Sequence, residues 1–206
     1  MKVKTYVLGM FQTNTYLAVN EETKECVIVD PALFSAEMKA YIQKEGLTPK
    51  AVLLTHGHID HMGGASETAK EYKIPIYAHE EELAVLKDAN VNLSSSFGAP
   101  YTLEEALPLK ADEKISFAGF SFRVIFTPGH TQGGCCYYEE SENVLFSGDT
   151  LFAGSVGRTD FPGGSTSALI RNIKERLLPL PDDTIVYPGH MQMTTIGNEK
   201  RENPFI

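Results

Sequence analysis

The stretch Thr55-His56-Gly57-His58-Ile59-Asp60-His61 places three imidazoles and one carboxylate within a single short segment. It directly follows residues 51–54, an apolar run that predicts a short strand. Strand ends are rigid supports, and the turns that follow them are frequent locations of functional sites. Imidazole and carboxylate are both ligands that Zn²⁺ accepts. The segment therefore predicts a metal site at the end of a strand.

Three further strings end in the same way, each with a donor after an apolar strand. IFTPGH ends at His130, LFSGD ends at Asp149, and IVYPGH ends at His190. With the first segment they bring the count to seven donors, whereas one tetrahedral ion takes about four. Seven donors fit two ions that share one carboxylate and one water. The count therefore predicts a binuclear site, while His79, which stands alone after another strand, is expected to be structural.

Bulk composition limits the class of protein. The chain has 206 residues, a length typical of one domain, with 42% hydrophobic and 22% charged residues. Its net charge of −9 and the absence of a basic run argue against a nucleic-acid partner. No apolar run is long enough to cross a membrane, and the N-terminus does not read as a signal peptide. We expect a cytoplasmic enzyme with a small-molecule substrate; the sequence is silent on oligomeric state.

Short strands alternate with helices along the chain. Strands are predicted at residues 3–8, 15–19, 25–29, 51–54, 74–78, 114–117, 120–126, 134–138, 144–147 and 185–187, and helices at residues 36–45, 65–72, 80–87 and 167–178. Ser35 is the expected N-cap of the first helix and Gly46 its C-cap. Residues 88–107 are irregular, and a connection of this length is usually functional or mobile. The two halves share one design, which predicts two packed sheets with helices outside.

The strings THGHIDH, TPGH, SGD and YPGH together resemble the metallo-β-lactamase fold of metallo-hydrolases, over nearly the whole chain. The resemblance implies an α+β four-layer αββα sandwich with the site at one edge. It also implies which residues hold each metal: His56, His58 and His130 the first, Asp60, His61 and His190 the second, with Asp149 as the bridge. His58 speaks against the flavo-diiron members, which carry a carboxylate there. Asp149 speaks against the zinc β-lactamases that use a cysteine at that point.

Two longer strings narrow the resemblance to the glyoxalase II-like branch, whose members hydrolyse thiolesters. SGDTLFAGSVGRTDFPGG spans residues 147–164, and TTIGNEKRENPF spans residues 194–205. The second string is similar to that of small bacterial members with one domain, so residues 1–206 are expected to form a single metallo-hydrolase domain without a C-terminal helical substrate domain. The branch's carrier-binding tyrosine is missing. Arg158 keeps the positive charge and either binds a substrate carboxylate or forms a salt bridge with Asp160.

The reaction expected from these residues is hydrolysis of an acyl thiolester, as in a hydroxyacylglutathione hydrolase, by a bridging hydroxide that the metals activate. Two Zn²⁺ ions are expected, with iron or manganese as alternatives in either site, and Asp60 is the candidate for proton transfer. The closest alternative is a persulfide dioxygenase with a single iron. Hydrolysis of lactones or β-lactams at the same site is another, and a metal-binding scaffold without activity is a third.

Two smaller groups of residues complete the expectations. Phe11, Phe152 and Phe161 are candidates for the wall of an apolar pocket, although core packing is favoured for Phe152. Neighbouring cysteines on a strand point to opposite faces, so Cys135 and Cys136 are poor joint metal ligands and are expected to pack in the interior.

Overall fold

The computed structural model describes residues 1–206 as two six-stranded sheets packed face to face. The first sheet has the order β1-β2-β3-β4-β5-β6 and the second β14-β13-β10-β9-β8-β7. The strands of the first sheet are β1 (Lys2–Leu8), β2 (Thr13–Asn20), β3 (Glu25–Val29), β4 (Thr48–Leu53), β5 (Ile76–His79) and β6 (Leu107–Leu109). Those of the second are β7 (Lys114–Phe117), β8 (Phe120–Phe126), β9 (Cys135–Glu139), β10 (Val144–Gly148), β13 (Ile185–Pro188) and β14 (Thr194–Thr195). A separate hairpin consists of β11 (Leu151–Phe152) and β12 (Ser155–Val156).

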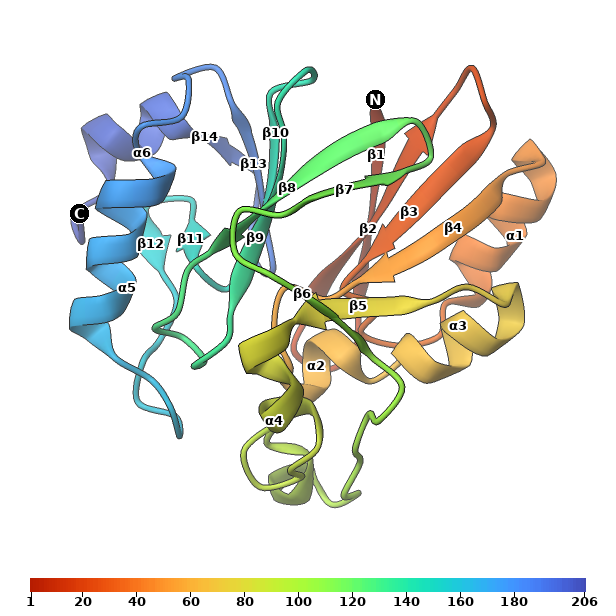
Figure 1. Cartoon of the computed structure of the whole chain (residues 1–206), viewed down its shortest axis with the longest axis horizontal. Coiled ribbons are helices and arrows are strands. Elements are labelled where there is room, and N and C mark those ends of the chain that lie inside the picture. The colour runs from red at the N-terminus through yellow and green to blue at the C-terminus, as the bar shows by residue number, and fades with distance from the viewer.

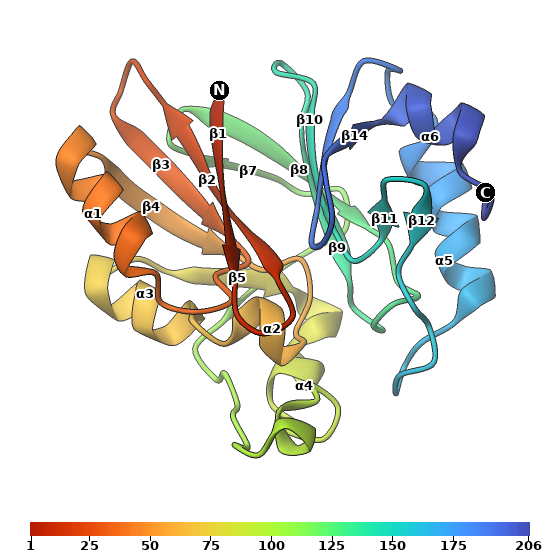
Figure 2. The ribbon, with the colours of Figure 1, turned by 180° about the vertical axis from the view of Figure 1, so that it is seen from behind.

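Helices cover the outer face of each sheet, as Figures 1 and 2 show from opposite sides. The first sheet is covered by α1 (Ala36–Glu45) and α3 (Ala65–Tyr72). The second is covered by α5 (Thr166–Asn172), which continues as a π-helical turn over Ile173–Leu177, and by α6 (Ile196–Glu202). The predicted four-layer αββα sandwich is therefore confirmed. None of these helices combines the length and the hydropathy needed to cross a bilayer.

Three apolar layers hold the sandwich together, and strand β2 shows why. Successive side chains of a strand point to opposite faces. Leu17 and Val19 pack towards the helices of the first sheet, whereas Tyr16 and Ala18 pack between the two sheets. A third layer lies between the second sheet and α5. Strands β3 and β10 are buried on both faces, so their sequences are nearly continuous apolar runs, whereas the edge strand β7 alternates.

Local sequence signals fix the ends of α1 as predicted. The Ser35 hydroxyl accepts a hydrogen bond from the Met38 amide at 3.1 Å, and Gly46 ends the helix in the left-handed region at φ 64°. Helix α3 also has the predicted bounds, Ala65–Tyr72. Helix α1 connects β3 to β4, and α3 precedes β5. The C-caps of the two helices therefore set where the chain re-enters the first sheet.

Several predicted elements differ from those observed. The helix expected at residues 80–87 is a 3₁₀ turn (Glu80–Glu82) followed by α4 (Leu83–Leu86), and the helix expected at residues 167–178 changes to π geometry. The turn expected after β4 is partly helical, because α2 (Ile59–Met62) begins inside it. Strands β6, β11, β12 and β14 were not predicted, because strands of two or three residues have no readable alternation, and the seven-residue helix α6 was missed as well.

Residues 88–107 are not a structureless connection. They contain a 3₁₀ turn at Ser94–Phe97, and internal hydrogen bonds close the segment. The Asn92 amide donates to the Tyr101 carbonyl at 2.8 Å, and the Tyr101 amide donates to the Ser94 hydroxyl at 2.9 Å. In both ribbon views this segment extends with α4 from the edge of the sandwich at which α2 lies. It therefore borders the site described next.

Candidate metal centre

The seven sequence-predicted donors meet at one edge of the sandwich, although they come from four separate segments of the chain. His56 and His58 follow β4, Asp60 and His61 lie on α2, His130 follows β8, Asp149 follows β10, and His190 follows β13. The strands end side by side, so each following turn projects its donor towards the same point. The first sheet supplies four of the donors and the second sheet three, so the site exists only when the two sheets are packed together.

The donor atoms form three groups, each compact enough for one ion. His56, His58 and His130 make one group, Asp60, His61 and His190 make a second, and His56, His61 and Asp149 connect them. Within each group the candidate ligand atoms lie within 4.8 Å of one another. The Asp149 carboxylate lies 3.3 Å from His61 Nε2 and 3.5 Å from both His130 Nε2 and His190 Nε2. Asp149 therefore occupies the centre of the cluster, between the two outer groups.

Outer hydrogen bonds fix the orientation of three of the imidazoles. The Thr55 hydroxyl donates to Asp30 Oδ2 at 2.6 Å, so it accepts from His56 Nδ1 at 3.2 Å. The same Asp30 carboxylate accepts from His61 Nδ1 at 2.9 Å, and the Arg158 carbonyl accepts from His130 Nδ1 at 2.7 Å. A proton on Nδ1 leaves Nε2 with a free lone pair. Such outer partners are typical of metal-binding histidines.

The unpaired atoms of the cluster indicate what completes it. His56 Nε2, His58 Nε2 and Asp149 Oδ1 are buried without a hydrogen-bond partner. Buried polar atoms are almost always paired, so unpaired ones require an explanation. A divalent cation satisfies imidazole nitrogens and carboxylate oxygens simultaneously. The residues present therefore fit a metal ion, and the His and Asp cluster supports divalent metal binding.

Burial and charge act in opposite directions on the groups of this cluster. Burial lowers the pKa of the His58 imidazole to about 3 and that of His56 well below its usual value, which keeps both neutral and able to bind metal. Burial opposes protonation of His190 as well, but hydrogen bonds to Asp149 and Asp60 raise its pKa to about 9. Burial also opposes ionisation of Asp149, yet His61 and His190 hold its pKa well below the usual range. The carboxylates thus stay ionised, and a bound cation would replace the proton that they hold on His190.

Glu82 is a buried residue that the sequence reasoning missed. Its Oε1 accepts from the Gly57 amide at 2.7 Å, while Oε2 accepts from the Thr131 hydroxyl at 2.9 Å and the Gly133 amide at 2.8 Å. Gly57 lies between two of the histidines and Thr131 follows a third. Burial raises the pKa of Glu82 to about 7 against these three hydrogen bonds. No sequence signal distinguished it from the exposed glutamates beside it.

Strand β2 supports the turn that carries His190, and this role was also missed. The Asn14 side-chain amide donates to the carbonyls of Pro188 and Met191 at 3.0 and 2.8 Å. The Tyr16 hydroxyl donates to the Pro188 carbonyl at 2.6 Å. These bonds hold the turn that carries His190. Within that turn a Cβ at Gly189 would collide with Asp149 and His61, so glycine is required.

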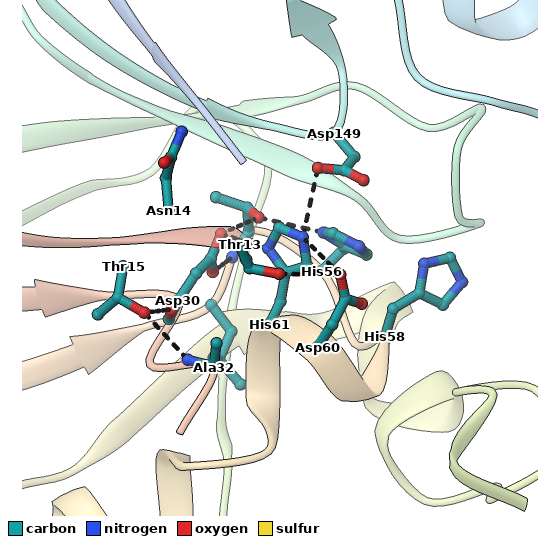
Figure 3. A network of polar contacts seen from close by, with 12 residues as sticks. Thr13, Asn14, Thr15, Asp30, Ala32, His56, His58, Asp60, His61 and Asp149 are labelled. Atoms are coloured by element: carbon teal, nitrogen blue, oxygen red, sulfur yellow. Dashed lines mark hydrogen bonds and ion pairs between the residues drawn. The ribbon is translucent and has the colours of Figure 1, made fainter. Parts of the chain in front are cut away.

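Asp60 faces the open side of the cluster. Thr13 donates to its Oδ2 at 3.0 Å, and His190 Nε2 lies 3.3 Å from the same oxygen. Figure 3 shows Asp30 on one side of His61 and Asp149 on the other, with Asp60 beside them. Burial raises the pKa of Asp60, but His61 and His190 outweigh it, so the pKa is lowered and the carboxyl stays ionised.

A cleft of about 420 Å³ opens over the cluster, and we call it the metal cleft. Phe11, Phe152 and Phe161 all line it, and Phe152 is also buried, as the sequence favoured. Arg158 is its one cationic side chain apart from the histidines. Arg158 pairs with Asp160 at 2.7 and 2.6 Å, and its guanidinium lies 4.1 Å from the centre of the Phe161 ring. The anticipated Arg158–Asp160 salt bridge is therefore present, at the rim of the metal cleft.

Three other residues singled out from the sequence lie outside the cluster. His79 stacks on Phe126 with centroids 4.2 Å apart and accepts from the Glu81 amide at 3.3 Å, and it belongs to none of the donor groups. Cys135 packs between the two sheets, whereas Cys136 packs against α5 on the other face. Both cysteines are buried with raised thiol pKa values, as burial dictates. The structural interpretation of all three is confirmed.

Comparison with known proteins matches this architecture along the whole chain. A family model described as the metallo-beta-lactamase superfamily matches residues 8–190. The chain is 38% identical over 208 residues to the "Probable metallo-hydrolase YqgX" of Bacillus subtilis, covering 100% of this chain and 98% of the relative. It is 37% identical over 210 residues to the "Hydroxyacylglutathione hydrolase GloC" of Haemophilus influenzae, with the same coverage.

Two solved structures share the fold at substantial identity. One, of "BLEG-1 B3 metallo-beta-lactamase", has a TM-score of 0.93 and 42% identity and covers 99% of both chains. The other, of "TTHA1623 in a di-iron-bound form", has a TM-score of 0.88 and 37% identity, covering 98% of this chain and 100% of that chain. The similar proteins therefore include one named a hydroxyacylglutathione hydrolase, one named a metallo-beta-lactamase and one in a di-iron-bound form.

Proposed function

This chain belongs to the metallo-beta-lactamase superfamily and is a metallo-hydrolase of that superfamily; on that basis we propose that it hydrolyses acyl thiolesters. The observation that carries the proposal is the seven-donor cluster at the floor of a cleft whose rim holds one arginine. The 37% identity to a hydroxyacylglutathione hydrolase over the full chain supports the same reaction. We also propose that residues 1–206 act as one catalytic domain, because both sheets supply donors to the same cluster.

Two metal ions are the stoichiometry that the donor groups support. The first would be held by His56, His58 and His130, the second by Asp60, His61 and His190, with Asp149 shared. Imidazole with carboxylate suits zinc, iron and manganese alike. We propose zinc in both positions, and the relative in a di-iron-bound form makes iron the first alternative to test. When bound, the metals supply an acidified water and polarise the carbonyl of the substrate.

Residues of the chain would orient the reactants around that chemistry. Hydrolysis forms a bond from a water oxygen to the acyl carbon and breaks the carbon–sulfur bond, giving a carboxylate and a thiol. Asp60, ionised and held by Thr13, would accept a proton from the attacking water. The departing sulfur needs little help from an acid, because a free thiol has a pKa of about 8.5.

Arg158 is the residue that we propose binds the thiol carrier. Two of its N–H groups are used by Asp160, and a guanidinium has five donors in total. The remaining donors at the rim of the metal cleft are available to a carboxylate of the substrate, such as those of glutathione. Stacking on Phe161 limits the orientations of the guanidinium and would reduce the entropy lost when it binds.

The direct test is thiol release from S-lactoylglutathione and from a simple acetyl thiolester by the purified, metal-analysed protein. We expect turnover that chelation abolishes and that the Asp149→Asn variant lacks. If the protein with its metal sites filled releases no thiol from either compound, thiolester hydrolysis is rejected. Oxygen uptake with glutathione persulfide at one iron per chain would instead support the dioxygenase considered from the sequence.

A second candidate, β-lactam hydrolysis, is favoured by one observation. The structure that matches with 42% identity is titled a B3 metallo-beta-lactamase, and its fold covers nearly the entire chain. Both reactions begin with attack of water on a carbonyl carbon, so the same donors serve either. A nitrocefin assay on the protein preparation used for the thiolester assay separates them, because the larger kcat/KM identifies the reaction that the metal cleft favours.

A further inference from the structure

A second cavity, of about 450 Å³, lies beside the metal cleft. Its walls are mainly apolar, and we call it the apolar chamber after Leu8, Met10, Phe11, Leu33, Ile59 and Phe97. These residues come from the end of β1, the β1–β2 connection, the residues after β3, the start of α2 and the segment at residues 88–107. Pockets of this size bind small molecules. Metal binding by the seven donors explains the metal cleft but not its neighbour, so the apolar chamber needs a separate explanation.

The apolar chamber adjoins the metal cleft rather than lying apart from it, because three residues belong to both linings. Phe11, Phe97 and Asp60 line both cavities. The two phenylalanine rings contact edge to face with centroids 4.8 Å apart, and both contribute to the lining of each cavity. Asp60 is the one charged side chain in the apolar chamber, and it lies at the end nearest the cluster. A molecule whose reacting carbonyl lies at the cluster can therefore extend into this chamber.

The charges of the two cavities differ in a way that selects what each accepts. The metal cleft has Arg158 at its rim, whereas the apolar chamber contains no cationic side chain. A thiol carrier with carboxylates is favoured on the side of Arg158 and disfavoured in a chamber whose one charge is the anionic Asp60. The acyl group is the other half of a thiolester, and an apolar acyl chain matches these walls.

The exposure of the walls supports the same occupant. Met10 is 80% exposed, Leu33 51%, Phe97 50% and Phe11 39%. Large apolar side chains gathered on one exposed surface usually mark a binding site. An alkyl chain in the chamber would remove these side chains from water, and burial of apolar surface would favour binding in proportion to chain length.

We propose that the apolar chamber binds the acyl chain of the substrate, so that the enzyme prefers thiolesters of unbranched apolar acids of about four to eight carbons over the lactoyl group. The inference rests on thiolester hydrolysis as proposed above, and it specifies the acyl half of the substrate. Each added methylene is expected to raise kcat/KM roughly two- to fourfold until the chamber is full.

The experiment measures kcat/KM for the acetyl, butanoyl, hexanoyl and octanoyl thiolesters of glutathione, with S-lactoylglutathione as the polar comparison. In the Leu33→Glu variant the octanoyl-to-acetyl ratio should fall about tenfold or more, because a charge then lies in the chamber wall. Ala99→Phe, which fills the chamber from the segment at residues 88–107, should lower the same ratio without adding charge. Val7→Glu places the same charge on exposed β1 outside the chamber and should keep the wild-type ratio.

The possible outcomes separate the two proposals. A kcat/KM that rises with chain length, and a rise lost in both chamber variants but kept in Val7→Glu, supports the inference. A profile that is flat or falls with chain length on an active enzyme overturns it and leaves thiolester hydrolysis standing. Absence of thiol release from every thiolester, lactoyl and acetyl included, overturns the proposed function and the inference with it.

Discussion

At the scale of single residues, Glu82 joins the two turns that carry three of the histidines. Replacing it by glutamine keeps its shape but puts an NH₂ group where a backbone N–H already points. At least one buried donor then loses its acceptor, which costs roughly 1–3 kcal/mol. We expect Glu82→Gln to lower the free energy of unfolding by about that amount. The measurement is urea denaturation of protein whose metal has been removed by a chelator. Glu81→Gln, one residue earlier and exposed, is the matched control and should change little.

The pH dependence of this effect has a definite sign. The pKa of Glu82 is raised from 4.5 to about 7, so in that interval the folded protein binds more protons than the unfolded chain. The contribution of Glu82 to stability is therefore largest below about pH 4.5 and is lost as the pH rises through about 7. The difference between wild type and Glu82→Gln should shrink between pH 5 and pH 7.5. A difference that grows over this interval would contradict the raised pKa.

A substitution at Arg158 tests recognition of the thiol carrier separately from the attack on the acyl carbon. Arg158→Ala should raise KM for a glutathione thiolester by about tenfold with a smaller change in kcat, because it removes a contact with the carrier and not with the reacting carbon. The KM of a thiolester with an uncharged thiol should change little. Arg171→Ala, on the exposed face of α5, is the matched control. Equal losses with charged and uncharged carriers would show that Arg158 acts through its pairing with Asp160 instead.

At the scale of elements, strand β2 joins the two sheets at both of its ends. Asn14 bonds to the turn after β13 that carries His190, and Asn20 donates to the Ala118 carbonyl at the opposite end at 2.9 Å. Asn14→Ala should weaken binding of the second metal about 10- to 100-fold, in line with other partners that orient ligands. Asn20→Ala should lower the free energy of unfolding by about 1 kcal/mol, as the loss of one hydrogen bond predicts, without altering metal affinity.

Competition with a chromophoric chelator measures both affinities. Equal affinities in the two variants would show that β2 stabilises the sandwich but does not position His190.

The elements differ in how far the sequence predicted them. Helices α1 and α3 and strands β3, β7 and β8 have the predicted bounds, because caps and apolar periodicity both mark them. The hairpin of β11 and β12 was missed because strands of two residues show no alternation. All seven donors were named because each follows an apolar strand in a short motif. Glu82, Asp30 and Asn14 were not, because their partners are distant in sequence and only packing brings them together.

At the scale of the whole molecule, metal binding and folding are coupled, since both sheets must pack to form the cluster. A ligand that binds only the folded state at 100 times its Kd adds about 2.7 kcal/mol of stability. For a chain of this size we expect chelation to lower Tm by roughly 5–10 °C, and added metal to restore it. Thermal scans with and without chelator measure this. An unchanged Tm would mean that the cluster forms and persists without regard to metal.

The central claim is that a binuclear centre in this fold hydrolyses thiolesters. The measurement that tests it most directly is a titration of chelated protein with zinc, and separately with iron, that follows thiol release and metal content together. We expect activity to rise until two ions are bound per chain and then to stay constant, and we expect Asp60→Asn to retain one ion. Activity that saturates at one ion per chain, or iron-dependent oxygen uptake with a persulfide in place of thiol release, would contradict it.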